Sequence, residues 1–246
     1  MAIAKAVTSH ECQRVLPQSG LPRSAEVPLA LLALIIAAPV LLIIAIAIAL
    51  DSRGPIIFRQ QRKGRGATNF VLYKFRTMVY GSEGPQITSS GDERITRVGL
   101  FLRRTKLDEL PEMWNVLRGD MSLVGPRPEV PRYVDLTNHM WQEVLRVRPG
   151  LTHPVTLKLR DEEKLLALLP GDYEHRYSEV LLPYKLKGYL AYENERTSHR
   201  DIEVLWRTFL VVILSTARRV VVWDEVYRES ADTKLSAHQD KDTKFG

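Results

Sequence analysis

The chain has 246 residues, of which 45% are hydrophobic and 26% charged, a composition that suits one globular domain with appended segments. Its 35 basic and 29 acidic residues fit a nucleic acid, an anionic membrane or a phosphorylated substrate, so charge alone selects no partner. The single cysteine, Cys12, excludes an internal disulfide and a cysteine-based zinc site and is consistent with a reducing compartment.

The N-terminal part predicts a polar tail followed by a membrane element. Residues 1–22 are polar and small, with proline and glycine near their end, and we expect a flexible tail there. From Val27 to Leu50 no residue is charged, and this run would measure about 36 Å as a straight helix, enough to cross a bilayer core. It is too long and starts too late for a cleavable signal peptide. Residues 23–50 are therefore expected to form a membrane helix.

Pro39 lies near the middle of this apolar run. It leaves an apolar arm of about 15 Å on each side, half of the hydrocarbon thickness, so a bent re-entrant helix fits the geometry. Basic residues flank both ends, Arg23 before the run and Arg53 and others after it, and the positive-inside rule then places both ends in the cytoplasm. A straight spanning helix with a tolerated proline remains the alternative.

A β-hairpin is expected next. Apolar and polar residues alternate on both sides of a Lys-Gly-Arg-Gly turn within residues 54–78, and Lys74 and Arg76 leave the second strand. The stretch Gly81–Asp92 is rich in glycine and serine, which predicts a loop. The following ITRVGLFLRR, residues 95–104, predicts a short helix with one apolar face.

An acidic pair, Asp108 and Glu109, precedes the next predicted helix. Pro111 is accepted only in the first turn of a helix, so the helix ELPEMWNVL is expected to begin near Asp108. Simple helix capping is the plainer interpretation of the pair, because aspartate is a favoured N-cap and glutamate suits the first turn.

The surrounding cations favour a second interpretation, a phosphate site. Arg103 precedes the acidic pair, and Arg127 follows it in a loop that Pro126 and Pro128 hold rigid. Phosphate binds readily at such a helix N-terminus, and a carboxylate among these cations is expected to stay ionised and hence nucleophilic.

Three stretches in order, DSRGPIIFRQQRKGR, YKFRTM and residues 96–128, closely resemble the catalytic domain of the bacterial monotopic phosphoglycosyl transferases, which are polyprenyl-phosphate sugar-1-phosphate transferases. The likeness runs from about Arg23 to Tyr133. The family's membrane signal, an acidic residue followed twelve positions later by Ser-Pro, is matched by Glu26 and by Ala38-Pro39, with Ala38 in place of the serine. The resemblance favours a re-entrant helix broken at Ala38 and Pro39.

The resemblance implies a role for each residue of the predicted site. Asp108 would be the nucleophile and a metal ligand, and Glu109 would assist the polyprenyl phosphate or the metal. Mg²⁺ would bridge the donor diphosphate on one or two carboxylates, so no preformed cage of acids is expected. The residues expected to bind substrate phosphate or to shape its site are Arg103, Arg127, Lys74, Arg76 and Pro126.

The resemblance also implies partners and a place in the cell. The donor would be a nucleotide sugar, most simply a UDP-sugar, and the acceptor polyprenyl phosphate at the bacterial inner membrane, with the catalytic domain on the cytoplasmic face. The reaction would run through a covalent aspartyl intermediate and begin the membrane assembly of a glycoconjugate. A homodimer is one possible assembly, and no nucleic acid is expected.

The resemblance thins beyond Tyr133. His153 has no assignable acidic partner, and a loop or core histidine is expected there rather than a catalytic base. Residues 202–223 are interrupted by arginines, so either an interfacial amphipathic helix or a core helix is expected. The fold class is α+β and mainly helical, with a cytosolic catalytic domain over residues 51–225 and a polar tail over 226–246.

Two other functions remain open. A membrane-anchored basic binding module would explain the charge and the apolar run, but not an acidic pair among spaced arginines. A nucleotide-sugar hydrolase would use water as the acceptor. The chain has no GxxxxGK[ST] stretch for ATP and no recognisable nucleic-acid motif.

Overall fold

The computed structural model describes residues 20–84, 91–160, 162–167 and 173–214. The C-terminal tail expected over 226–246, all but the last three residues of the tail expected over 1–22, and part of the Gly81–Asp92 loop lie outside these residues. In the described part, the chain is mostly helical with two small two-stranded sheets, which confirms the predicted mainly helical α+β class.

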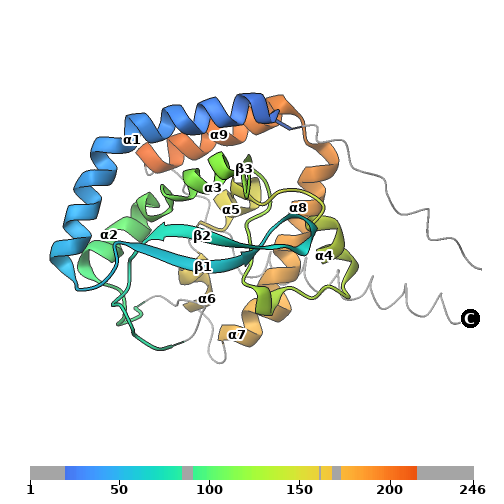
Figure 1. Cartoon of the computed structure of the whole chain (residues 1–246). Helices are drawn as coiled ribbons and strands as arrows, with labels where there is room; N and C mark the ends of the chain where they lie inside the picture. The colour runs from blue at the N-terminus through green and yellow to red at the C-terminus, as the bar shows by residue number, and fades with distance from the viewer. Residues whose placement is uncertain (1–19, 85–90, 161, 168–172, 215–246) are drawn as a thin grey trace, which may run out of the picture.

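The elements follow one another along the chain as Figure 1 shows. The α-helices are α1 (Arg23–Asp51), α2 (Arg97–Thr105), α3 (Glu112–Arg118), α4 (His139–Val144), α5 (Pro154–Lys158), α6 (Glu162–Ala167), α7 (Tyr173–Arg176), α8 (Leu182–Glu195) and α9 (Ser198–Leu214). The strands are β1 (Ile57–Lys63), β2 (Asn69–Phe75), β3 (Ser122–Val124) and β4 (Gly150–Thr152). Short 3-10 turns lie at Arg65–Ala67, Leu107–Glu109 (η2) and Pro131–Tyr133, and a π-helical turn (η4) lies at Tyr177–Leu181.

Helix α1 is long, apolar and largely uncovered by the rest of the protein. Among the described residues it is the one helix long and apolar enough to cross a membrane, and only 11% of its most apolar stretch is buried. Pro39 lies inside the helix, where a proline lacks the N–H that would bond the Ile35 carbonyl. The helix bends along its length (Figure 1), and an internal proline is a usual cause of such a bend.

The first turn of α1 is fastened to the end of α3. Arg23 donates to the carbonyls of Val116, Leu117 and Met121, and one Glu26 carboxylate oxygen accepts from the Leu123 N–H at 3.0 Å. Glu26 is only 2% exposed, so this bond is shielded from water. The apolar helix is therefore tied directly to the segment that follows the acidic pair.

The predicted β-hairpin is confirmed. Strands β1 and β2 pair antiparallel, with Ile57 opposite Phe75 and Lys63 opposite Asn69. The buried Asn115 side chain accepts from the Tyr73 N–H and donates to the Val71 carbonyl at 2.7 Å, which joins α3 to the edge of β2. The short helix expected over 95–104 is also confirmed as α2.

The helix expected to begin at Asp108 begins instead at Glu112. Pro111 is its N-cap, and Asp108 lies before it in the separate turn η2. Pro111 separates η2 from α3, because it lacks the N–H that would bond the Leu107 carbonyl. On the other side of η2, the left-handed backbone of Lys106 (φ 61°) ends α2. The expectation that Asp108 caps the helix is therefore wrong.

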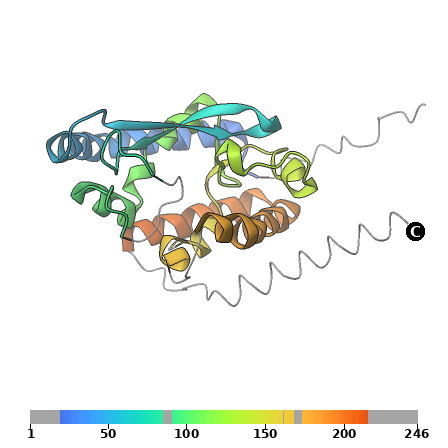
Figure 2. The same ribbon diagram turned by 90° about the horizontal axis from the view of Figure 1, so that it is seen from below.

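Helices α1 and α9 both lie at the top of the molecule in Figure 1. The view from below shows that they lie apart from each other (Figure 2). Both pack against β3. On α9, the exposed side chains of Ile202, Trp206 and Phe209 form an apolar stripe, with the two rings stacked 5.6 Å apart. This part of the helix expected over 202–223 suits a membrane interface; residues 215–223 lie outside the described part.

Two apolar cores lie beneath α1, and a larger one lies among α4, α5, α6, η4 and α8. Strands β3 and β4 form a short parallel pair, which connects the part of the molecule around the cores under α1 with the part around the larger core. Gly125 and Gly150 are required there, since a Cβ on Gly150 would lie 2.1 Å from the Gly125 nitrogen. The hairpin and the loops after α2 and β3 consequently face the C-terminal helices.

Candidate active site

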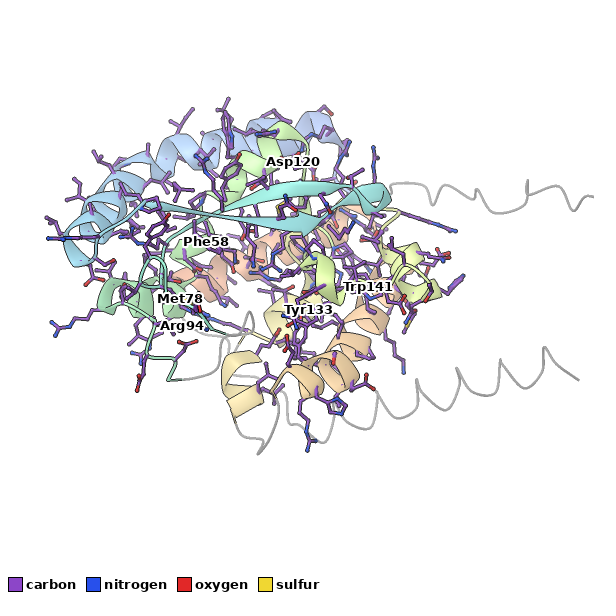
Figure 3. All side chains as sticks on the ribbon, turned by 60° about the horizontal axis from the view of Figure 1, so that its bottom comes forward. Phe58, Met78, Arg94, Asp120, Tyr133 and Trp141 are labelled. Atoms are coloured by element: carbon purple, nitrogen blue, oxygen red, sulfur yellow. The ribbon has the colours of Figure 1, made fainter. Side chains whose placement is uncertain are left out.

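A large cleft, with a volume of about 1210 Å³, lies between these two parts of the molecule. The hairpin forms one wall, η2 and the loop after β3 form another, and η4, α8 and α9 form the third. Phe58, Met78, Arg94 and Tyr133 line it and lie on the side of the hairpin opposite α1 (Figure 3). The predicted site residues Asp108, Glu109, Arg103, Arg127 and Lys74 all line this cleft.

Asp108 is buried in the cleft without a capping role. Its side chain is 8% exposed, and Oδ1 is buried with no hydrogen-bond partner among the described residues. A capping aspartate would accept a backbone N–H of the next turn, whereas α3 receives no side-chain cap. A buried acceptor without a partner is costly, and such atoms are found where a ligand or ion completes the site.

Glu109 is held by two cations. Arg127 pairs with it through both arms of its guanidinium, one of them at 3.2 Å from Oε2, and Lys74 Nζ lies 3.0 Å from Oε1. Pro126 and Pro128 fix the backbone of Arg127, as the sequence indicated. The two neighbouring acids therefore have different environments, because Glu109 is fully paired and Asp108 is not.

Glu112 is a third carboxylate that the sequence reasoning did not assign. It is 1% exposed and lies 3.1 Å from Lys74 Nζ, so this lysine bridges Glu109 and Glu112. A sequence signal was present: Glu112 follows Glu109 by three residues, a spacing that brings helical side chains to one face.

Burial sets the charge state of Asp108. It raises the pKa of this carboxyl above its ordinary value, and the charge of Glu109 raises it further. Lys74, Lys106 and Arg103 oppose the shift without reversing it. The direction of this shift is opposite to the expectation that the surrounding cations would favour ionised Asp108, because burial and Glu109 outweigh them.

Glu109 and Glu112 differ from one another as well. Burial would raise the pKa of Glu109, but Arg127, Lys74 and Lys106 hold it well below its ordinary value. For Glu112, the effect of burial is larger than that of Lys74, so its pKa is raised. The site thus contains Glu109, whose pKa is lowered, between Asp108 and Glu112, whose pKa values are raised. Shifted pKa values of this kind are common at functional sites.

Arg103 and Arg76 occupy different surroundings. Arg103 lies on the last turn of α2, lines the cleft and donates to Thr77 Oγ1 at 3.4 Å. Arg76 is 4% exposed, and its guanidinium donates to the carbonyls of Ile48, Ser52 and Pro55 at the end of α1. The structure thus gives Arg76 a role in closing α1, and its contact with phosphate stays a prediction.

A second polar cluster lines the cleft beyond Arg127, and sequence reasoning missed it. Lys185 Nζ lies 3.4 Å from Glu129, 3.1 Å from Glu162 and 3.2 Å from the Tyr177 hydroxyl, which also donates to Glu129. These residues come from the loop after β3, α6, η4 and α8, so their meeting depends on long-range folding.

His153 lies outside the cleft chemistry, which confirms the interpretation of a core residue. It is fully buried between the rings of Tyr189 and Tyr192, and its Nδ1 accepts the Val155 N–H at the start of α5. Burial and the nearby Arg196 lower the pKa of His153 to about 3, so it is neutral at physiological pH.

The carboxylates of the cleft fit a magnesium ion that also binds substrate oxygens. No group of three or more His, Cys, Asp or Glu side chains in the described residues could hold a metal alone. Mg²⁺ is usually bound by one or two carboxylates together with phosphate oxygens, and the buried Asp108 Oδ1, which has no partner among the described residues, would fit as one such ligand.

A cleft lined by acids and cations and a long exposed apolar helix together are consistent with a membrane-associated protein. The chain belongs to the bacterial sugar transferase family, whose model matches residues 18–215.

Curated relatives are similar over about half of this chain. A UDP-N-acetylgalactosamine-undecaprenyl-phosphate N-acetylgalactosaminephosphotransferase of Aeromonas hydrophila is 42% identical over 137 residues, 53% of this chain and 32% of the relative. A UDP-glucose:undecaprenyl-phosphate glucose-1-phosphate transferase of Caulobacter vibrioides is 48% identical over 120 residues, 47% of this chain and 45% of the relative. A Bacillus subtilis protein described as a putative undecaprenyl-phosphate N-acetylgalactosaminyl 1-phosphate transferase is 44% identical over 118 residues, 47% of this chain and 66% of the relative. The chain thus matches between about a third and two thirds of these relatives' lengths.

Proposed function

We propose that the protein transfers a sugar 1-phosphate from a nucleotide sugar, most simply a UDP-sugar, to polyprenyl phosphate through a covalent intermediate on Asp108. The relatives' names support this reaction class, since they pair UDP-sugars with undecaprenyl phosphate. The observation that carries the proposal is the position of Asp108, a buried carboxylate with an unpartnered oxygen in the cation-lined cleft. The sugar itself is left open.

The chemistry takes two displacements at one phosphorus atom. An Asp108 oxygen attacks the sugar-bearing phosphorus, the bond from that phosphorus to the bridging oxygen breaks, and the nucleoside monophosphate leaves with that oxygen. An oxygen of polyprenyl phosphate then attacks the same phosphorus and releases the Asp108 carboxylate. One phosphoanhydride is broken and one is made, so no further energy source is needed.

The surrounding side chains supply charge and position. Arg103 and Arg127 would contact phosphate oxygens, for which a planar guanidinium is well matched. Lys74 and Arg127 keep Glu109 in place, and Glu109 would then assist the entering lipid phosphate. When bound, Mg²⁺ would neutralise charge on the diphosphate, with Asp108 and substrate oxygens as its ligands.

We also propose that α1 is re-entrant and that the cleft lies on the cytoplasmic side of the inner membrane. The internal Pro39, the bend of α1 and the basic residues at both ends support this topology. The fastening of Arg23 and Glu26 to the end of α3 would keep the acidic pair close to the membrane surface, where a lipid phosphate can reach it.

The covalent intermediate gives the decisive test. Purified wild-type protein with Mg²⁺ and a panel of UDP-sugars, but no lipid, should release about one equivalent of uridine monophosphate and gain the mass of a sugar phosphate, as expected for a ping-pong enzyme. Peptide mapping should place the adduct on Asp108. Asp108→Asn should neither release the monophosphate nor gain this mass. Glu109→Gln should still form the sugar-phosphate adduct but transfer it poorly to polyprenyl phosphate.

The same experiment separates the alternatives. A hydrolase would release sugar phosphate continuously without lipid, and a binding module would release no monophosphate with any donor. An adduct on another residue, or a burst that persists in Asp108→Asn, would remove Asp108 from the mechanism.

A further inference from the structure

We propose that Lys106 is a further substrate-binding residue, whose ammonium contacts the diphosphate of the nucleotide donor. This inference rests on the proposed function, because it names one more contact of the same cleft. It is carried by the position of Lys106, by its available charge and by its backbone conformation.

Lys106 connects α2 directly to the turn that carries Asp108. Its N–H bonds to the carbonyls of Leu102 and Arg103 and so ends α2, and the next residue begins η2. Its side chain lines the cleft and acts electrostatically on both Asp108 and Glu109. The positive charge of Lys106 would therefore also act on a phosphate group attached to Asp108.

Other cations near Asp108 are already committed. Lys74 bridges Glu109 and Glu112, and the Arg127 guanidinium grips Glu109. Further along, Lys185 is enclosed by Glu129, Glu162 and Tyr177. By contrast, the Lys106 ammonium makes no hydrogen bond or ion pair within the part of the chain that the structure describes.

A diphosphate needs positive charge that carboxylates have not neutralised. Three acids, Asp108, Glu109 and Glu112, line or adjoin the place where the sugar-bearing phosphate must arrive. Their field repels an anionic donor, and the committed cations largely cancel it rather than reverse it. An ammonium with three donors and no partner among the described residues is suited to bind the incoming oxygens.

The backbone of Lys106 supports a functional role over a structural one. Its φ of 61° lies in the left-handed region, where glycine or asparagine is the unstrained choice at the end of a helix. A lysine at such a position carries strain, and its ammonium makes no contact within the described residues that would offset this strain. Strain of this kind concentrates at ligand sites.

The test measures UDP binding separately from turnover. Calorimetric titration with UDP and Mg²⁺ uses the wild-type full chain in detergent as the parent, since UDP carries no sugar phosphate to transfer. Into this parent we place Lys106→Met, which removes the charge at constant length, and Lys106→Gly, which removes it while easing the backbone. Lys106→Arg keeps the charge, and Lys187→Met removes an exposed lysine of α8 outside the cleft as the matched control.

We expect UDP to bind about 10- to 100-fold more weakly to the Met and Gly variants, the scale of a lost hydrogen bond to a charged group. The Arg variant should bind within a few fold of the parent, and the Lys187→Met control should match it. In a chain that is wild type apart from Lys106→Met, the KM for the UDP-sugar should be raised.

Parent-like UDP binding by Lys106→Met or Lys106→Gly would overturn the inference while leaving the proposed function intact. If the parent binds UDP but forms no adduct with any donor, the proposed function fails, and the Lys106 comparison still decides the inference. A parent that binds no UDP would overturn the inference as well.

Discussion

Asp108 holds its carboxyl where burial and the charge of Glu109 both favour the neutral form. Because its pKa is higher in the folded than in the unfolded protein, its ionisation destabilises the fold. This penalty is absent below the unfolded pKa and grows as pH rises through the folded pKa. Reactivity at this residue therefore conflicts with stability.

Asp108→Asn should consequently stabilise the protein at neutral pH by on the order of 1 kcal/mol. The gain should shrink as pH falls towards the ordinary aspartate pKa of about 4, because the unfolded chain then also takes up the proton that the folded protein already holds. Thermal unfolding of both proteins in detergent across this pH range measures it. Glu109→Gln is the control of opposite sign, since the depressed pKa of Glu109 marks a carboxylate that stabilises the fold at neutral pH. An Asp108→Asn variant less stable than wild type at neutral pH would contradict this argument.

Arg127→Lys should be far from conservative. The lysine keeps one charge but loses the two-armed grip on Glu109 and the planar match to phosphate. We expect a loss of about 1–3 kcal/mol in transition-state stabilisation, measured as a fall in kcat/KM for sugar-phosphate transfer. Near-normal activity would make Arg127 a structural clamp only.

Among the elements, α5 depends on a buried histidine as its N-cap. The pKa of His153 is about 3 in the folded protein against 6.5 for an ordinary histidine. Between these values the unfolded chain takes up a proton that the folded chain refuses, so stability falls as pH drops from about 6.5 towards 3.

His153→Asn should flatten this pH dependence, because asparagine can accept the Val155 N–H and does not titrate. The variant should be less stable at neutral pH, since it loses packing against Tyr189 and Tyr192. Chemical unfolding at several pH values between 4 and 7, with wild type in parallel, measures the two slopes. An unchanged slope would show that His153 does not cause the acid sensitivity.

The elements that depend on neighbouring residues in the sequence were predicted correctly. The hairpin follows from period-two alternation around a glycine turn, and α2 from its apolar face. The start of α3 was misplaced because Pro111 is its N-cap rather than a residue inside its first turn, so Asp108 and Glu109 form the separate turn η2 before it.

The candidate site was predictable to the same degree. Asp108, Glu109 and Arg127 lie near one another in sequence and meet in the cleft. The cluster around Lys185 was not foreseen, because Glu129 reaches it across 56 residues. The resemblance implied a phosphate role for Arg76, but its guanidinium donates to the Ser52 carbonyl at the end of α1, 24 residues earlier in the chain.

At the scale of the whole molecule, α1 and α9 place two exposed apolar surfaces on one side (Figure 1). If α1 is re-entrant, cysteines introduced at Lys5 and Arg65, with Cys12 replaced by serine, should both react only from the cytoplasmic side. Impermeant thiol reagents on intact cells and on inverted vesicles measure this. Labelling at position 5 from the outer side of intact cells would mean that the helix spans.

The start of α1 is also closed by residues from the far end of the fold. Asp201, fully buried, accepts the Leu21 N–H at 2.8 Å across 180 residues, and Ser198 donates to the Gly20 carbonyl. A ribosome adds about 5–20 residues per second, so roughly 10–40 s separate the synthesis of the two partners. If α1 enters the bilayer as soon as it is synthesised, it does so before this fastening can form, and the cleft is then completed against a helix that the lipid already holds.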